Sequence, residues 1–392
     1  MPAGKAARPP RAARERVVAG VMSGTSADGL DVALVRIAAP GWGWQLLGFH
    51  HARYAARDRR AILAVAEGKA TVAELARLDV WLGRRIGEAV LEAARLAGLC
   101  PARPDVIASH GQTVFHQGRV ATLQVGDAAT IAAVAGVPVV SDFRSADIAA
   151  GGEGAPLVPW ADWRLLTHRR RYRVALNLGG IANLTLLPPR AQPAQVLGFD
   201  TGPGNMALDA CMQQFSGGRR PFDAWGGLAS SGRANAALLR RLLRHPFFRR
   251  RPPKSAGREQ FGAAYVAEVV GQAPRLAGAD VMATLVALTA ETVAAGLRGA
   301  GPEALAGEVI VSGGGVHNRA LMAALQAAAP GCRWLTSDQV GVPAQAKEAI
   351  AFALLGEAHL RGEPGNLPSV TGAARAVVLG SFTPAPSASP RR

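Results

Sequence analysis

Short apolar runs separated by glycine-rich turns dominate the hydrophobic and polar pattern of this chain. Residues 17–22 and 32–37 are apolar and flank the turn S-G-T-S-A-D-G, which predicts a β-hairpin. Residues 172–187 repeat the arrangement around a Gly-Gly turn with an asparagine on each side. Residues 308–325 predict a strand, three glycines and then an amphipathic helix. We therefore expect a duplicated fold that holds one nucleotide between its halves.

The segments between these hairpins predict helices and short strands in alternation. Apolar residues recur every three or four positions from 71 to 99, which indicates an amphipathic helix closed by Gly98 and Pro101. A second helix is predicted over residues 280–297, with its start signal at Asp280. Strands are expected at residues 106–110, 121–125, 137–140 and 196–199. This alternation predicts an α/β fold with mixed sheets.

The same pattern divides the chain into two domains with a tail at each end. Residues 1–16 lack the apolar core of a secretory signal and predict a disordered tail, and residues 382–392 are of low complexity. Residues 17–150 form the predicted N-terminal domain, on which a C-terminal segment could pack. Residues 151–381 form the predicted C-terminal domain. The glycine-rich segment 141–159 reads as both linker and cleft wall.

Composition narrows the possible functions. The 392 residues suffice for two hydrophobic cores, and 49% of them are hydrophobic. The net charge of +16 comes almost entirely from arginine, and no aromatic residues are interleaved with the basic runs, so we expect no nucleic-acid partner. No apolar run between charges is long enough to predict a membrane span. Three scattered cysteines without a C-x-x-C favour a cytoplasmic protein.

The first turn has the residues that a phosphate-binding loop needs. Its small side chains, backbone N–H groups and glycines suit the close approach of phosphate oxygens. It is not a Walker A loop, because the lysine and the following helix are missing. Taken alone, such a hairpin is more often structural. The second hairpin and the triple glycine strengthen the nucleotide-binding interpretation.

Six motifs resemble a known family when they are taken together. They are G-V-M-S-G-T-S-A-D-G-L-D, S-H-G-Q-T-V-F-H, D-F-R-S-A-D-I-A-A-G-G-E-G-A-P-L-V-P, N-L-G-G-I-A-N, G-F-D-T-G-P-G-N and S-G-G-G-V-H-N. The chain resembles the anhydro-N-acetylmuramic acid kinases over residues 17–381. That family belongs to the sugar kinase/Hsp70/actin superfamily, so the resemblance implies a two-domain actin-like ATPase fold with a central cleft.

The resemblance also implies a reaction. ATP would phosphorylate 1,6-anhydro-N-acetylmuramic acid while water opens its anhydro bridge, which gives N-acetylmuramic acid 6-phosphate and ADP in peptidoglycan recycling. The implied partner is thus a small sugar, and relatives of this kind predict a homodimer. The segment 252–261 resembles a family loop as well, and no role follows for it from the sequence.

The implied ATP site draws on both hairpins and on the triple glycine. Asp28 and Asp31 would hold Mg²⁺ through water, although Asp31 could equally cap the turn. Ala27 stands where relatives usually have leucine, on the apolar side of the turn. The implied nucleotide-binding residues are Gly24, Thr25, Ser26, Ala27, Asp28, Gly29, Leu30, Asp31, Asn177, Gly179, Gly180, Gly313, Gly314, Gly315 and Asn318.

Asp200 matches the catalytic aspartate of the family. It follows the strand predicted at residues 196–199 and lies in a Gly- and Pro-rich turn predicted over residues 198–205. A carboxylate fixed in this way could orient and deprotonate a water. Without the family motif, an aspartate before Thr-Gly-Pro would more often be a turn-former.

The implied sugar site is polar. Arg144 is suited to the lactyl carboxylate of a muramic acid, because a guanidinium binds a carboxylate through two parallel hydrogen bonds. The histidines could instead be structural, Asp147 could pair with Arg144, and Glu348 could lie on a solvated helix face. The candidate residues are His110, Gln112, His116, Arg144, Asp147 and Glu348.

Three other functions compete with this interpretation. The chain could phosphorylate a different sugar, or use ATP to change conformation as actin does. It could bind nucleic acid through its arginines. It could also be a glycosidase that uses two carboxylates, such as Asp147 and Asp200. Dependence of sugar turnover on ATP separates a kinase from a glycosidase, and salt-dependent retention on duplex DNA tests for nucleic-acid binding.

Overall fold

The computed structural model describes residues 14–24 and 27–386. Residues 1–13 and 387–392 of the two predicted tails lie outside this range, as do Thr25 and Ser26. The tails were predicted too long where the structure can be compared with them. Arg16 begins the first strand, and Phe382 and Thr383 belong to the last one, because each pairs with a strand inside the fold.

The chain divides into two compact units. Unit 1 comprises the described residues of Met1–Leu157, Ala346–Asn366 and Ala373–Arg392, and unit 2 comprises Val158–Gln345 and Leu367–Gly372. The chain therefore first passes from unit 1 to unit 2 after Leu157. The sequence predicted this boundary after residue 150. The C-terminal segment returns to unit 1 except for Leu367–Gly372.

Unit 1 contains a mixed seven-stranded sheet. Its order is β12-β6-β4-β1-β2-β3, and β5 pairs with β4. The first three strands in the chain are antiparallel neighbours, whereas β4 lies parallel to β1 and β6 lies parallel to β4. The strands are β1 (Arg16–Ser23), β2 (Gly29–Ile37), β3 (Trp44–Arg53), β4 (Val106–Gln117), β5 (Ala121–Val125), β6 (Val139–Ser141) and β12 (Ser381–Thr383).

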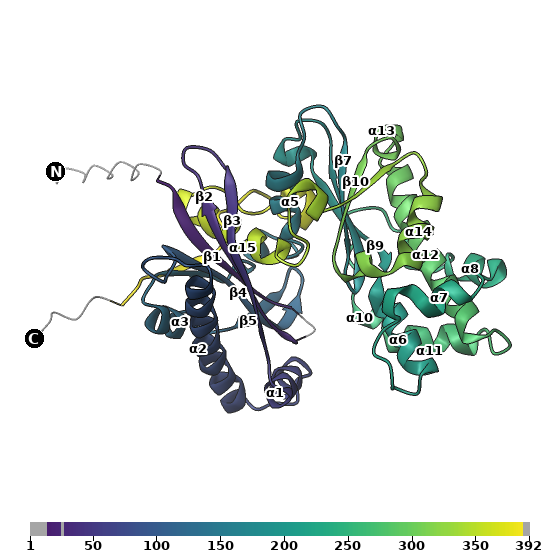
Figure 1. Ribbon diagram of the computed structural model, residues 1–392, viewed down its shortest axis with the longest axis horizontal. Helices are drawn as coiled ribbons and strands as arrows, with labels where there is room; N and C mark the ends of the chain where they lie inside the picture. Colours follow the sequence, from purple (N-terminus) through teal and green to yellow (C-terminus); the bar gives the residue numbers. More distant parts are fainter. Residues whose placement is uncertain (1–13, 25–26, 387–392) are drawn as a thin grey trace, which may run out of the picture. The chain divides into compact units, whose positions relative to one another are not determined.

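Helices cover both faces of this sheet (Figure 1). The predicted amphipathic helix is α2, which begins with a capping box between Thr71 and Glu74 and packs its apolar face on Ala19 and Val21 of β1. Helix α15 approaches β1 so closely that a Cβ at Gly20 would meet the carbonyl of Ala349. Because alternate residues of a strand face opposite sides, α2 and α15 cover opposite faces. The helices are α1 (Ala56–Ala66), α2 (Val72–Leu96), α3 (Ala128–Ala135), α4 (Ser145–Ala149) and α15 (Lys347–Arg361).

Unit 2 repeats the strand order of unit 1 in a five-stranded sheet. Its order is β11-β10-β7-β8-β9, with β7, β8 and β9 antiparallel and with β10 and β11 parallel to β7. In both units the order is therefore third, second, first, fourth and fifth strand, once β5 and β12 are set aside. The strands are β7 (Arg173–Leu178), β8 (Ile181–Leu187), β9 (Leu197–Pro203), β10 (Glu308–Ser312) and β11 (Arg333–Thr336). This repetition confirms the predicted duplicated α/β fold.

The helices of unit 2 also lie on both faces of its sheet. A Cβ at Gly296 of α12 would contact Leu184 and Phe199, whereas a Cβ at Gly198 would contact Pro159 of α5. The helices are α5 (Val158–Leu166), α6 (Asn205–Phe215), α7 (Gly227–Ser231), α8 (Ala236–Leu242), α9 (Pro246–Arg249), α10 (Arg258–Phe261), α11 (Ala263–Gly271), α12 (Gly278–Gly299), α13 (Pro302–Leu305), α14 (Arg319–Ala328) and α16 (Pro368–Thr371). Short 3₁₀ turns are η1 (Pro193–Gln195), η2 (Ala224–Gly226), η3 (Gly314–His317) and η4 (Asp338–Val340).

Helix α12 is the predicted helix of residues 280–297. Among the described residues, it alone has the length and hydropathy of a possible membrane span. Most of its apolar window is buried inside the structure, where residues such as Met282, Leu285 and Val293 belong to the core of unit 2. Its apolar character thus has an explanation in the packing of this core.

One predicted turn is wrong. The segment 198–205 was expected to be a turn, but β9 continues through Asp200 to Pro203. The reason is the neighbouring strand, because β8 supplies pairing partners up to Ile181, which lies opposite Pro203. Proline is tolerated there because β9 is an edge strand. Asp200 consequently lies within a strand.

Candidate active site

The first glycine-rich turn joins β1 to β2 in unit 1. The amide of Ala27 donates to the carbonyl of Gly24 at 3.0 Å, and Ala27 is fully buried with φ at 50°. The side chain of Leu30 is buried in the core, so Ala27 and Leu30 could contact a nucleotide only through their backbones. Gly29 pairs with Arg53 in the sheet, and Asp28 is exposed. The described part of the turn remains compatible with a phosphate loop.

Asp31 is the third residue of β2, and its side chain faces the neighbouring strand instead of capping the turn. Its Oδ1 is 2.7 Å from Nδ1 of His51, which is its cross-strand neighbour on β3. Burial raises the pKa of Asp31, and His51 partly opposes this shift. The described residues contain no group of three or more His, Cys, Asp or Glu side chains that could hold a metal ion. A cation bound through water thus fits this site better than one bound directly.

Gln112 connects the predicted sugar site to the first turn. Ser23, the last residue of β1, donates from its Oγ to Oε1 of Gln112 at 2.6 Å. The same hydroxyl lies 2.9 Å from the hydroxyl of Tyr54. Gln112 and Ser23 are both buried, so these bonds fix the end of β1 before the turn begins.

His110 and Arg144 form the centre of the predicted sugar site. Nε of Arg144 donates to Nε2 of His110 at 3.0 Å, and Nδ1 of His110 donates to the carbonyl of Gly111 at 2.8 Å. Burial and, to a smaller extent, Arg144 lower the pKa of His110 to about 3, so the imidazole is neutral. Burial lowers the pKa of Arg144 to about 10, which keeps the guanidinium charged at neutral pH. The pair therefore presents one positive charge.

Asp147 is linked to Arg144 through hydrogen bonds to the backbone of one shared residue. It is fully buried, and its Oδ2 accepts from the amide of Gly154 at 2.8 Å while its Oδ1 accepts from Nδ2 of Asn366 at 2.6 Å. The carbonyl of Gly154 in turn accepts from Nη1 of Arg144 at 2.7 Å. Asp147 thus acts on Arg144 through the Gly154 peptide. Both carboxylate oxygens of Asp147 are therefore already bonded to groups within unit 1.

His116 and Glu348 lie at the exposed side of the same group. His116 accepts or donates at its Nδ1 with Oγ1 of Thr122 at 3.1 Å, and burial and Arg144 lower its pKa. Glu348 is in the first turn of α15, exposed, and close enough to Arg144 to raise that residue's pKa. All six predicted sugar-site residues thus belong to unit 1, and the charges of five of them, His110, His116, Arg144, Asp147 and Glu348, interact.

A row of polar residues crosses the sheet of unit 2. Ser312 of β10 is the register neighbour of Asn177 on β7, which lies opposite Asn183 on β8, which lies opposite Asp200 on β9. Neighbours in register project from the same face of a sheet with Cβ atoms about 5 Å apart. The structure therefore places the predicted catalytic residue in line with the predicted nucleotide-binding hairpin.

Asp200 is held by the segment that follows α9. Its amide donates to the carbonyl of Lys254 at 3.0 Å, and its Oδ2 accepts from the amide of Ala256 at 2.8 Å. Burial raises the pKa of Asp200 to about 6, while the bond from Ala256 and the charge of Lys254 oppose the shift. Among the described residues, none forms an ion pair with Asp200. A fixed carboxylate with a pKa near 6 is suited to act as a general base.

Three glycine-rich segments of unit 2 converge around Asn205. Its Nδ2 donates to the carbonyl of Leu178 at 2.8 Å, and its amide donates to the carbonyl of Gly179 at 2.9 Å. A Cβ at Gly313 would lie 2.7 Å from Oδ1 of Asn177, and a Cβ at Gly315 would lie 2.6 Å from the Leu178 side chain. Only glycine fits these two positions, so the triple glycine packs against the end of the β7–β8 hairpin.

A cavity of about 310 Å³ opens beside Asn205. Its wall includes Gly314 and Asn318 of the predicted adenosine site, together with the acidic Asp209 and the aromatic Trp225 and His317. The helix after the triple glycine begins later than predicted. The 3₁₀ turn η3 intervenes, and Asn318 caps α14 by accepting from the amide of Leu321 at 3.0 Å. The ring centroids of Trp225 and His317 lie 6.0 Å apart with the rings nearly perpendicular.

Several residues of these sites were not predicted. Asn205 belongs to the G-P-G-N motif and could have been chosen from it. Ser23 directly precedes the first turn, and Asp209 follows Asn205 by one helical turn, which places both on a common face. Asn366 carries no local signal, because its bond to Asp147 joins residues far apart in the chain.

The repeated strand order, the two glycine-rich hairpins and the fixed carboxylate define the class of actin-like ATPases, which includes sugar kinases and Hsp70. The profile of the family described as anhydro-N-acetylmuramic acid kinase matches residues 16–385. The chain belongs to the anhydro-N-acetylmuramic acid kinase family.

Individual relatives cover nearly the whole chain. The anhydro-N-acetylmuramic acid kinase of Streptomyces coelicolor is 43% identical over 374 residues, which is 94% of this chain and 93% of the relative. That of Thiobacillus denitrificans is 44% identical over 93% of this chain and 96% of its own. The sequence identity to the following solved structure is much lower. The ADPNP-bound activator of a Clostridium difficile 2-hydroxyisocaproyl-CoA dehydratase is 10% identical, with a TM-score of 0.44, over 88% of this chain and 96% of its own.

Proposed function

We propose that this chain is an ATP-dependent kinase of 1,6-anhydro-N-acetylmuramic acid that opens the anhydro bridge with water and phosphorylates O6. The bond from the water oxygen to C1 forms as the bond from C1 to the bridge oxygen breaks. The bridge oxygen, now O6, takes the γ-phosphoryl group of ATP. The products are N-acetylmuramic acid 6-phosphate and ADP, as required for peptidoglycan recycling in the cytoplasm.

Asp200 is the base that removes the proton from the attacking water. Its backbone amide and its Oδ2 are both tied to the segment 254–256, so the carboxylate is positioned before substrate arrives. A pKa of about 6 leaves it ionised at neutral pH and still basic enough to accept a proton. This placement of Asp200 is the observation that carries the proposal.

Arg144 binds the lactyl carboxylate of the sugar. Its Nε and Nη1 are used by His110 and Gly154, which fixes the plane of the guanidinium. The remaining N–H groups of the guanidinium would donate to the lactyl carboxylate. Glu348 and His116 flank this charge and supply acceptors and donors for the sugar hydroxyls and the acetamido group.

The nucleotide is bound by the glycine-rich segments. Gly179 and Gly314 allow phosphate oxygens to approach the backbone, because a Cβ at either would meet no atom closer than 3.3 Å, and the cavity beside Asn205 accepts the adenosine. Asp209 lines that cavity, and burial raises its pKa to about 6. Its carboxylate would accept hydrogen bonds from ribose hydroxyls, as acidic residues do in other nucleotide sites.

Asp28 and Asp31 hold Mg²⁺ through water. Their carboxylates are close enough for Asp28 to raise the pKa of Asp31, and one oxygen of Asp31 is already used by His51. Two such carboxylates suit an ion that keeps most of its water ligands. When bound, Mg²⁺ neutralises charge on the transferring phosphoryl group.

Product analysis tests the proposal directly. The protein is incubated with ATP, Mg²⁺ and 1,6-anhydro-N-acetylmuramic acid, and the products are examined by ³¹P NMR and mass spectrometry. We expect a phosphate monoester coupled to the C6 protons and an equal amount of ADP. Turnover of the sugar without ATP would instead indicate a glycosidase, and phosphorylation of other sugars alone would indicate a different sugar kinase.

The predicted homodimer is part of this proposal. Light scattering coupled to size-exclusion chromatography measures the mass in solution, and a mass near twice the 40.6 kDa of one chain is expected. A mass near 40.6 kDa at all concentrations would contradict it.

A further inference from the structure

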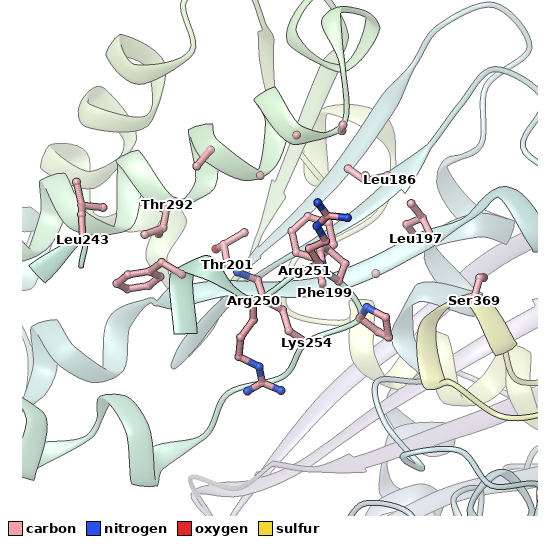
Figure 2. A pocket seen from close by; sticks show the side chains of 18 residues that line it. Leu186, Leu197, Phe199, Thr201, Leu243, Arg250, Arg251, Lys254, Thr292 and Ser369 are labelled. Atoms are coloured by element: carbon pink, nitrogen blue, oxygen red, sulfur yellow. The ribbon is translucent and has the colours of Figure 1, made fainter. Parts of the chain in front are cut away.

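A second and larger cavity in unit 2 has no place in the proposed reaction. Its volume is about 750 Å³, and it lies between β9, the C-terminal half of α12 and the segment 250–254 (Figure 2). Small-molecule sites in proteins usually occupy about 300–1,000 Å³. Phe199 and Thr201 line it, whereas Asp200 between them does not, because alternate residues of a strand face opposite sides.

The wall of this cavity combines apolar and cationic groups. Leu186, Leu197, Phe199 and Phe248 supply apolar surface, and Lys254 and Arg251 supply positive charge. The lining contains no aspartate or glutamate. Such a wall complements a molecule with an apolar body and one negative charge.

Arg251 is the cation best placed to meet such a charge. Its side chain is exposed, and no carboxylate within the described part of the chain forms an ion pair with Arg250 or Arg251. Figure 2 shows the Arg250 side chain extending away from Leu186 and Leu197, and the Arg251 guanidinium on the side of Leu186. A guanidinium beside apolar surface forms stronger hydrogen bonds to an anion than one surrounded by water.

The cavity adjoins the groups that hold Asp200. Lys254 lines it, and the carbonyl of the same residue accepts from the amide of Asp200. Two residues further on, the amide of Ala256 donates to Oδ2 of Asp200 at 2.8 Å. A ligand that moves the segment 250–254 therefore changes the position of the carboxylate.

We propose that this cavity is an effector site for a small organic anion with an apolar ring, bound by Arg251 against the apolar wall, and that its occupancy alters turnover through the segment 254–256. The binding part stands independently of the proposed function, whereas the effect on turnover rests on it. A failed kinase assay would thus leave the binding part testable.

The fluorescent anion 8-anilinonaphthalene-1-sulfonate is a suitable probe, because it has one sulfonate on an aromatic body. Fluorescence titration of the folded full chain should show one saturable site. Arg251→Glu should raise the Kd at least tenfold, because it reverses the charge that meets the sulfonate. Ala295→Phe, which fills the cavity from an exposed position on α12, should abolish saturable binding. Circular dichroism verifies the fold of each variant.

Arg249→Glu is the matched control, because it makes the same charge change two residues away on an exposed side chain outside the lining. It should change the Kd less than twofold. No saturable binding, equal effects of the two charge reversals, or loss of binding in Trp225→Ala of the smaller cavity would each overturn the binding site. A dimer that dissociates in Ala295→Phe would show that a second copy of the chain covers the cavity, which also overturns it.

The effect on turnover is measured with the probe at saturation. The kcat of the wild-type chain should change at least twofold, and the kcat of Arg251→Glu should not respond. An unchanged wild-type kcat at full occupancy would overturn the effector role.

Discussion

The two sheets share one strand order, and each carries a candidate site aspartate whose carboxylate has different bonding partners. In unit 1, Asp31 lies on the second strand and faces His51 on the third, at 2.7 Å. In unit 2, the second strand carries Asn183 and the third carries Asp200, whose carboxylate accepts from the backbone amide of Ala256 and whose own amide donates to the carbonyl of Lys254. Burial raises the pKa of both carboxylates, but the shift of Asp31 is opposed by its histidine neighbour, whereas the shift of Asp200, to about 6, is opposed by the Ala256 amide and the charge of Lys254.

We therefore expect the two units to affect different kinetic parameters. The described residues of unit 1 that were predicted for the sugar lie around Arg144, which is suited to binding. Unit 2 holds the carboxylate whose pKa is raised to about 6. Changes in unit 1 should therefore act mainly on KM, and changes at Asp200 should act mainly on kcat.

Replacement of Asp200 should have the largest effect. Asp200→Asn keeps the shape of the side chain and removes the base, so kcat should fall by about 10²–10⁴-fold while ATP and sugar still bind. Steady-state kinetics measure kcat, and calorimetry measures binding. A variant that keeps more than about a tenth of wild-type kcat would break the comparison, because Asp200 would then be no more essential than Asp31.

Replacement of Arg144 should mainly affect the KM for the sugar. Arg144→Lys keeps the charge and loses the planar fork, so KM for the anhydro-muramic sugar should rise about 10–100-fold with a smaller change in kcat. An anhydro-N-acetylglucosamine analogue, which lacks the lactyl group, is the control, and its weaker binding should hardly change. Equal losses with both sugars would assign Arg144 to the fold instead of the carboxylate.

The pH dependence should report the raised pKa of Asp200. The enzyme with bound nucleotide needs the ionised carboxylate, so kcat/KM for the sugar should decline below about pH 6, by about tenfold per pH unit. The profile is measured with saturating nucleotide between pH 4.5 and 8. A midpoint near pH 4, the ordinary value for an aspartate, would contradict the effect of burial.

Replacement of Asp31 should have a modest effect. Asp31→Asn removes one of two carboxylates near the first turn, and we expect the Mg²⁺ concentration for half-maximal rate to rise about threefold. Asp58→Asn, on the exposed helix α1, serves as the control. If Asp31→Asn lowered kcat at saturating Mg²⁺ as much as Asp200→Asn does, the two carboxylates would be equally important for turnover, which would contradict this comparison.

The smallest effect concerns stability. The folded pKa of Asp200 lies above the ordinary value of 3.8, so the native state binds the proton more tightly and stability declines as pH rises through about 4 to 6. Asp200→Asn should therefore raise the Tm at pH 8 by about 2 °C, and the gain should vanish below pH 4. Calorimetry at the two pH values measures it. A lower Tm at pH 8 would mean that the bond from Ala256 outweighs the cost of burial.

The sequence by itself determined the local elements and the candidate residues. Alternating apolar runs and glycine-rich turns specified the β1–β2 and β7–β8 hairpins, and the spacing of apolar residues specified α2 and α12, because these patterns act over a few residues. The motifs indicated the family and the candidate site residues, apart from Ser23, Asn205, Asp209 and Asn366. The sequence did not predict the length of β9, because the pairing of this strand with β8 outweighs the turn preference of glycine and proline.

Only the tertiary structure decided how these residues act together. The row from Ser312 to Asp200 exists because β10 pairs in register with β7, the first of three consecutive strands that lie more than a hundred residues earlier in the chain. The raised pKa of Asp200 comes from burial beneath the segment 254–256, and Asp147 supports Arg144 with help from Asn366, more than two hundred residues away. Such contacts depend on the packing of whole elements, and no local pattern of residue types encodes them.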